Sequence, residues 1–161
     1  MRLSAVTALF SSAGCTVAGR QSDDDESQAG YQTDEDVVYD HDSLELQLRQ
    51  ESVHFGDTVE IEVKNTGESE VSLGCQNPWA LQKHSDGEWR HVTWTGEKYY
   101  RLCYTGLTPD SSISEEIPLS RSELTQQVDD VQTELRPGQY RFVLLGTSPF
   151  VALDFTVLAS A

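Results

Sequence analysis

Alternation of apolar and polar residues is the main pattern from residue 44 onward. Residues 44–49 have the sequence Leu-Glu-Leu-Gln-Leu-Arg, residues 59–64 have Val-Glu-Ile-Glu-Val-Lys, and residues 151–158 alternate in the same way. A period of two places successive side chains on opposite faces of a strand. Each stretch therefore predicts a half-buried antiparallel strand.

A β-hairpin is predicted around Ser85-Asp86-Gly87, because alternating runs at residues 79–83 and 88–92 flank these three residues. Asp-Gly between two such runs is the strongest short-range signal for a hairpin. The pattern is less regular afterwards. It predicts a short edge strand near residues 99–104, a strand over 113–119 and, from apolar residues at near-helical spacing, a helical excursion over 122–135.

Residues 135–142, Leu-Arg-Pro-Gly-Gln-Tyr-Arg-Phe, combine a turn with the start of a strand. Pro137 fixes φ and Gly138 accepts positive φ, so Pro-Gly predicts a turn. From Tyr140 onward the alternation returns. Gly-x-Tyr after such a turn resembles the tyrosine corner of immunoglobulin-type sandwiches, in which the Tyr hydroxyl bonds to backbone a few residues upstream. Phe142 stands where antibody domains have their second cysteine, so the antibody-type disulfide is absent.

Three successive patterns carry a wider resemblance: Phe-Gly-Asp-x-Val-x-Ile-x-Val-x-Asn-x-Gly, Trp-Ala-Leu-x-Lys-x-x-x-Asp-Gly-x-Trp and Leu-x-Pro-Gly-x-Tyr-Arg-Phe. Together they resemble the bacterial immunoglobulin-like domains of secreted and surface lipoproteins, over about residues 43–158. The resemblance implies an all-β, immunoglobulin-like antiparallel sandwich of seven or eight strands that acts in protein interaction or as a spacer, without catalytic residues. Small proteinase inhibitors have a related pattern, so a proteinase inhibitor or ligand-binding lipoprotein is the alternative.

The chain is strongly acidic. Its 161 residues include 27 acidic and 11 basic side chains, for a net charge of −16, and residues 41–161 alone carry 19 acidic and 9 basic side chains, for a net charge of −10. This Lys-poor, acid-rich composition resembles proteins of extreme halophiles, especially haloarchaea, in which salt screens the self-repulsion. Nucleic acid is an unsuitable partner, because phosphate binding needs a basic patch.

The N-terminus predicts export. Residues 1–15 contain a short apolar stretch that ends in Ala-Gly-Cys, which resembles a lipobox whose cysteine, Cys15, receives a diacylglyceryl anchor. An ordinary cleaved signal and a chance apolar N-terminus are the alternatives, and the true start codon is left open. Residues 16–41 predict a disordered acidic tether, and residues 42–161 the domain. The expected location is the cell surface, with the membrane as a partner through the lipid.

Catalytic, metal and cofactor patterns are absent from the sequence, so we expect no enzyme and no cofactor. The four histidines, His41, His54, His84 and His91, are not followed by the His, Cys and Met that a blue-copper site needs after Cys103. Trp79 or Trp89 is expected in the core or on a sheet face. Three further aromatic residues are candidates for an exposed surface that binds an unknown protein or glycan: Trp94, Tyr99 and Tyr100.

Two cysteines remain if Cys15 carries lipid. Cys75 ends one predicted strand, Cys103 lies in another, and the predicted hairpin lies between them. Paired thiols persist as disulfides in an oxidising compartment. The sequence therefore predicts a Cys75–Cys103 disulfide, with two separate half-buried thiols as the alternative.

Overall fold

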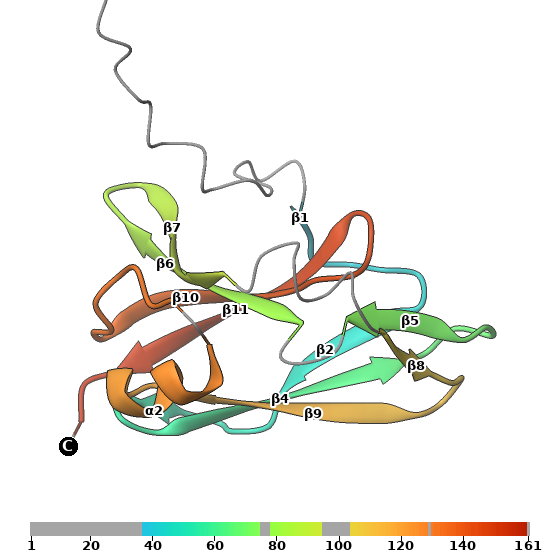
Figure 1. The fold of residues 1–161 in the computed structure, drawn as a ribbon, viewed down its shortest axis with the longest axis horizontal. Coiled ribbons are helices and arrows are strands. Elements are labelled where there is room, and N and C mark those ends of the chain that lie inside the picture. The colour runs from blue at the N-terminus through green and yellow to red at the C-terminus, as the bar shows by residue number, and fades with distance from the viewer. Residues whose placement is uncertain (1–36, 75–77, 95–103, 129, 161) are drawn as a thin grey trace, which may run out of the picture.

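The computed structural model describes residues 37–74, 78–94, 104–128 and 130–160. It shows layers of β-structure that face each other, with one short helix at the side (Figure 1). The strands are β1 (Val37–Val38), β2 (Leu44–Leu48), β3 (Val53–His54), β4 (Thr58–Asn65), β5 (Val71–Gly74), β6 (Trp79–Ser85), β7 (Glu88–Trp94), β8 (Tyr104–Leu107), β9 (Ser112–Pro118), β10 (Gly138–Leu144) and β11 (Phe150–Leu158). The helix is α2 (Arg121–Gln127).

The strands form three sheets. The large sheet has the order β1-β11-β10-β6-β7, and β3 also pairs with β11. Its central pairs are antiparallel, whereas β1 and β3 run parallel to β11. The three-stranded sheet, β2-β4-β9, is antiparallel throughout. β5 and β8 form a separate two-stranded sheet at one end of the sandwich (Figure 1). The predicted all-β, immunoglobulin-like sandwich is confirmed. The described residues hold more strands than the seven or eight predicted, in part because β1 and β3 have only two residues each.

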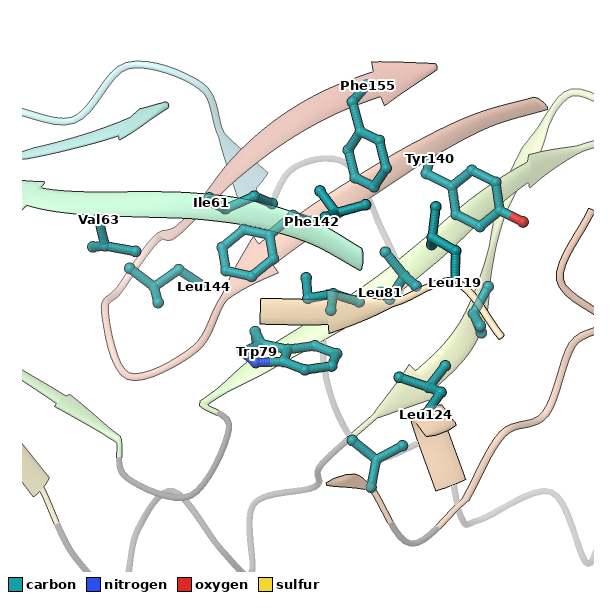
Figure 2. Close-up of a cluster of buried hydrophobic side chains, with 14 of the residues drawn as sticks. Ile61, Val63, Trp79, Leu81, Leu119, Leu124, Tyr140, Phe142, Leu144 and Phe155 are labelled. Carbon is teal, nitrogen blue, oxygen red and sulfur yellow. The ribbon is translucent and has the colours of Figure 1, made fainter. Parts of the chain in front are cut away.

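Side chains from the two larger sheets meet in one core (Figure 2). Tyr140, Phe142 and Leu144 of β10 enter it from the large sheet, and Ile61 and Val63 of β4 enter it from the other side. All five are fully buried. Burying one such side chain stabilises the fold by about 1.5–3 kcal/mol. The alternation of the sequence thus supplies the inward face of each strand, as predicted.

The predicted hairpin is formed by β6 and β7. Ser85 pairs with Glu88, so the loop consists of Asp86 and Gly87. Both loop residues have positive φ, 56° and 86°. Positive φ at both positions defines the type I′ turn, whose twist matches that of the flanking strands. The Asp-Gly signal therefore predicted the place of the hairpin, and the structure adds the type of its turn.

The tyrosine corner is present. The Tyr140 hydroxyl donates a hydrogen bond to the carbonyl oxygen of Arg136 at 2.7 Å, and it accepts one from the Arg136 amide at 3.0 Å. Burial raises the pKa of this hydroxyl, and its bond to the Arg136 backbone opposes the rise in part. The hydroxyl is therefore a neutral link that fixes the turn before β10 to the strand itself.

A second polar link closes the far end of β4. The buried Asn65 side chain donates to the carbonyl oxygens of Ser69 at 2.8 Å and Leu107 at 2.7 Å, and its Oδ1 accepts from the Gly67 amide at 2.9 Å. All three bonds go to backbone groups, which would otherwise lack partners near the core. Asn65 therefore joins the turn after β4 to β8.

The helix is shorter than the helical excursion predicted over residues 122–135. It ends at Gln127, because Val128 adopts an extended conformation with φ −130° and ψ 147°. Val131 then pairs with Thr93 in an isolated bridge. Val128, Val131 and Leu135 are all buried, but none of them lies in a helix. Their spacing was compatible with a helix, and pairing with the edge of the large sheet decided the conformation.

The sheet begins earlier than the predicted domain boundary at residue 42. Val37 and Val38 pair with Phe150 and Val151 of β11, and the Tyr39 hydroxyl lies 3.1 Å from Oδ1 of Asp154. These contacts place residues 37–39 in the domain, although their sequence was assigned to the tether. The signal and the rest of the tether, residues 1–36, lie outside the described residues and stay predictions.

Candidate interaction surface

The residues that the sequence nominated for binding and modification lie largely outside the described part of the chain. This holds for Tyr99 and Tyr100 of the candidate aromatic surface, and for Cys15, Cys75 and Cys103. Trp94 is the last residue of β7, where its backbone pairs with Ala80 of β6. The aromatic surface of Trp94, Tyr99 and Tyr100 therefore stays a prediction.

A different cluster lies on the outer face of the large sheet, the face turned away from the core. Arg141 is at its centre and is only 5% exposed. Its guanidinium carbon lies 4.1 Å from the ring centroid of Trp89 and 5.3 Å from that of Tyr39. Its Nε donates to Oδ1 of Asp154 at 3.2 Å. We call Tyr39, Trp89, Arg141 and Asp154 the Arg141 cluster.

Strand register explains how the Arg141 cluster forms. Tyr140 and Phe142 point into the core, so Arg141 between them points outward. Asp154 is its direct partner on β11. A planar guanidinium stacks on aromatic faces while it pairs with a carboxylate, and stacking of this kind stabilises by roughly 0.5–2 kcal/mol. The cluster thus connects the segment after β1, two central strands and the hairpin.

Apolar side chains continue the outer face beside the Arg141 cluster. A second group of buried hydrophobic residues lies there, with Phe150 packed against it: Val37, Ala80, Val143, Leu145 and Ala152. Gln82 is also buried, at 4% exposed, and its Oε1 has no hydrogen-bond partner among the described residues. The outer face is therefore not a simple solvated surface, because it combines apolar, aromatic and polar groups.

Part of this face is exposed at the hairpin. His84 is exposed and meets the half-buried Trp89 edge to face, with 5.1 Å between ring centroids. His91, farther along β7, is half-buried, and burial lowers the pKa of its imidazole. An exposed His beside a partly exposed Trp offers a flat aromatic contact and a hydrogen-bonding group. Such a pair suits protein interfaces, where Trp is enriched.

Groups suited to metal binding do not gather in the described ranges. No set of three His, Cys, Asp or Glu side chains is close enough there to hold a metal ion. His54 and Asp57 approach at 3.5 Å, but the Asp57 carboxylate accepts the backbone amide of His54 at 2.8 Å and so belongs to the turn before β4. As for membrane crossing, the described residues contain no helix of sufficient length and hydropathy to span a bilayer.

The sequence did not predict the Arg141 cluster. A weak signal was available, since Arg141 and Asp154 are single charges within two mostly apolar strands. Their pairing, however, depends on the register of β10 and β11. Tyr39 and Trp89 approach Arg141 because strands that are distant in sequence lie together in the fold.

Solved structures that resemble this chain are distant. The archaellum periplasmic stator protein FlaG from Sulfolobus acidocaldarius is 15% identical, with 70% of this chain and 99% of that chain covered and a TM-score of 0.37. A beta-glucosidase from Listeria innocua in complex with glucose is 16% identical over 71% of this chain, which spans 16% of the glucosidase, with a TM-score of 0.40. These TM-scores are too low to inform function. No curated protein matches the sequence.

The sequence of residues 40–144 matches the family described as bacterial Ig-like domain. The match includes most of the strands, the hairpin and the tyrosine corner. The structure of these residues is the sandwich that immunoglobulin-like domains form. Because the match extends over more than half of the chain, the protein belongs to the bacterial Ig-like domain family.

Proposed function

We propose that this protein is an exported, lipid-anchored Ig-like module that acts in protein interaction, or as a spacer, at the cell surface. The proposal rests on the structural role of the buried polar side chains. Tyr140 holds a turn, Asn65 holds another, and Arg141 joins β10 to β11. These side chains stabilise a scaffold. A scaffold of this kind suits a protein that presents a surface.

The proposed anchor is a diacylglyceryl group on Cys15, with residues 16–36 as the tether. Support comes from the apolar stretch and Ala-Gly-Cys sequence before the tether, and from the acidic composition within it. Two acyl chains on one residue give stable membrane attachment, whereas one chain gives only reversible binding. The acidic tether repels itself and so favours an extended spacer.

Strand directions favour the hairpin as the presented part. The tether enters the domain at Val37, which pairs with Phe150 at the start of β11. β6 is antiparallel to β10, which is antiparallel to β11, so β6 and β11 run the same way. The hairpin tip at Asp86 therefore lies toward the end of β11, away from Val37. Figure 1 shows this separation between β1 and the tip. We propose that the exposed side of the hairpin, with His84 and Trp89, contacts a protein partner.

Membrane fractionation tests the anchor. We expect the wild-type protein in the membrane fraction and the Cys15→Ser variant in the soluble or secreted fraction. Recovery of Cys15→Ser in the membrane fraction at the wild-type level would contradict lipid anchoring. A Ser12→Ala variant is the matched control, because it changes the same segment and leaves the cysteine in place.

Site-specific photo-crosslinking tests the presented surface. A photoreactive residue replaces His84 in one variant and Gln47, which is exposed on the three-stranded sheet, in another. We expect a specific crosslinked product from position 84 on intact cells and none from position 47. Equal products from both positions, or a product from position 47 alone, would argue against the hairpin as the contact. No product from either would favour the spacer role.

A further inference from the structure

β7 is the last strand of the large sheet, so one of its two edges faces away from β6. The chain after α2 covers part of that edge, since Val131 forms a bridge with Thr93. The other part, from Glu88 to Arg90, has no partner strand within the described ranges. Figure 1 shows the hairpin of β6 and β7 at the periphery of the domain. This part of the edge is therefore open to a strand from outside.

The open edge offers a backbone donor and a backbone acceptor at Trp89. Ser85 and Glu88 are paired across the two-residue turn, and the bond that closes such a turn runs from the Glu88 amide to the Ser85 carbonyl oxygen. Hydrogen-bonded and non-hydrogen-bonded pairs alternate along an antiparallel ladder. Because Glu88 bonds to β6, the N–H and C=O groups of Trp89 point away from β6. They can bond to a further strand.

We propose that the open edge of β7 pairs with the same edge of a second copy of this chain, antiparallel and about a two-fold axis at Trp89. In this register Trp89 lies opposite Trp89 of the second copy, and their backbones exchange two hydrogen bonds. Glu88 of each copy then lies opposite Arg90 of the other. A two-fold interface requires a self-complementary surface of this kind.

The charges select this register. A shift of the axis by one residue in either direction would place Glu88 opposite Glu88, or Arg90 opposite Arg90. Like charges directly opposite each other destabilise a strand pair, whereas opposite charges and aromatic pairs stabilise it. Arg90 can turn to the second copy, because its ion pair with Asp86, at 3.4 Å, is exposed and such pairs contribute little.

Net charge also favours the hairpin as the contact between two copies. The charged side chains of β6, β7 and their loop are two basic and two acidic ones, so their net charge is zero: Lys83, Arg90, Asp86 and Glu88. β4 and β9 of the three-stranded sheet carry four glutamates and one lysine. Two acidic copies therefore repel each other less at the hairpin than at the three-stranded sheet.

The pairing is short and therefore weak. Only Glu88 to Arg90 take part on each side, and such a contact is smaller than the roughly 1,200 Å² of a stable interface. We expect a dissociation constant on the order of 0.1 mM in solution. The biological role rests on the proposed function, because anchors in one membrane would raise the effective concentration of the copies. A second copy is then the protein partner of the hairpin.

Sedimentation equilibrium of the purified full chain tests the pairing, at up to about 1 mM protein and in about 0.15 M KCl, where charges act over about 8 Å. Every protein carries Cys15→Ser and is kept reduced, so that neither acyl chains nor disulfides link two copies. We expect an equilibrium between monomer and dimer. A chain that stays monomeric would overturn the proposal and would show that the charges of the edge prevent pairing.

Charge reversal tests which surface is used. Glu88→Arg and Arg90→Glu should each weaken self-association about tenfold or more, because each places like charges opposite each other. An equimolar mixture of the two variants should form heterodimers with an affinity near that of the wild type, because opposite charges face each other again. This result would also show that both variants are folded.

Glu68→Arg is the matched control, because it makes the same change of charge at an exposed position outside the hairpin. It should not weaken self-association. Two results would overturn the proposal: Glu88→Arg and Arg90→Glu variants that dimerise as the wild type does, or a mixture that associates no more strongly than either variant alone.

Crosslinking on intact cells separates this inference from the proposed function. With a photoreactive residue at position 84, a product of two identical chains would support the second copy. A product with a different protein, from a chain that is monomeric in vitro, would overturn the second copy and leave the hairpin as the contact. A dimer in vitro without any product on cells would support the pairing and contradict the proposed contact at the cell surface.

Discussion

The indole nitrogen of Trp79 donates a hydrogen bond to a carboxylate oxygen of Glu115, 3.2 Å away. Trp79 belongs to β6 of the large sheet and Glu115 to β9 of the three-stranded sheet, so the bond connects the two layers. Glu115 occupies an inward position of β9, between Ile113 and Ile117. Burial raises the pKa of its carboxyl group, and the bond from Trp79 lowers it by less.

This relationship predicts that Glu115→Gln stabilises the protein near neutral pH. A carboxyl group with a raised pKa binds its proton more tightly in the folded state. Stability is therefore lost as pH rises from the ordinary value of 4.5 through the folded pKa. Gln is neutral, and its carbonyl oxygen can still accept the bond from Trp79. Urea unfolding between pH 4 and pH 8 should show the gain at the upper end only.

Glu68→Gln is the control for Glu115→Gln, because it removes the same charge from an exposed position. Its effect in the same experiment should stay within about 0.5 kcal/mol. A Glu115→Gln variant that is less stable than the wild type at pH 7 would show that the charged carboxylate contributes to the fold.

Tyr140→Phe should destabilise the domain by about 1–3 kcal/mol, because it removes the partner of two polar backbone groups of Arg136. Tyr39→Phe is matched to it. It also removes a hydroxyl group that donates to an acceptor, but Tyr39 is exposed. Its cost in urea unfolding should be at most about 0.5 kcal/mol. An equal loss of unfolding free energy in the two variants would show that the tyrosine corner does not stabilise the domain.

Like charges face each other on the three-stranded sheet. Glu60 of β4 lies directly opposite Glu116 of β9, whereas Glu45 of β2 lies opposite Lys64 of β4. Glu116→Lys should therefore stabilise the domain by about 0.2–1 kcal/mol in dilute buffer, and Glu45→Lys should destabilise it by a similar amount. Both effects should shrink in molar KCl, where charges are screened within a few ångströms.

The wild-type midpoint itself should rise with KCl, because the domain carries a large negative charge. Thermal unfolding of all three proteins over a range of KCl concentrations checks both expectations. A wild-type curve that does not change with salt would count against a halophilic protein.

Arg141→Lys should destabilise the domain by roughly 1 kcal/mol, although the charge is kept. Lysine lacks the planar group that stacks on Trp89 and Tyr39. Arg90→Lys provides the comparison, since the Arg90–Asp86 pair is exposed and such pairs contribute little. If the two substitutions have the same effect in urea unfolding, stacking does not stabilise the outer face.

Local sequence patterns predicted much of the fold. The period of two in β4 and β10 predicted which side chains are buried, and Asp86-Gly87 predicted the hairpin. Pro137-Gly138 and Tyr140 predicted the tyrosine corner. In each case the information lies within about ten residues, so steric rules and side-chain period were enough.

The same rules could not predict contacts between segments that are distant in sequence. The parallel pairing of Val37 with Phe150 was unforeseen, because a strand of two residues has no periodic pattern. The Arg141 cluster joins residues from four parts of the chain, so its geometry required the register of every strand between them. The helix ended early because the edge of the large sheet competed for Val131.

We propose that a folded Ig-like domain is held outside the membrane by a tether that proteases can cleave. Brief treatment of intact cells with a broad-specificity protease tests it most directly, followed by mass spectrometry of the released protein. We predict a released domain whose new N-terminus lies within residues 16–36, just before β1. A chain that resists the protease until the cells are lysed would contradict the surface location, and cleavage within the strands would contradict the folded domain.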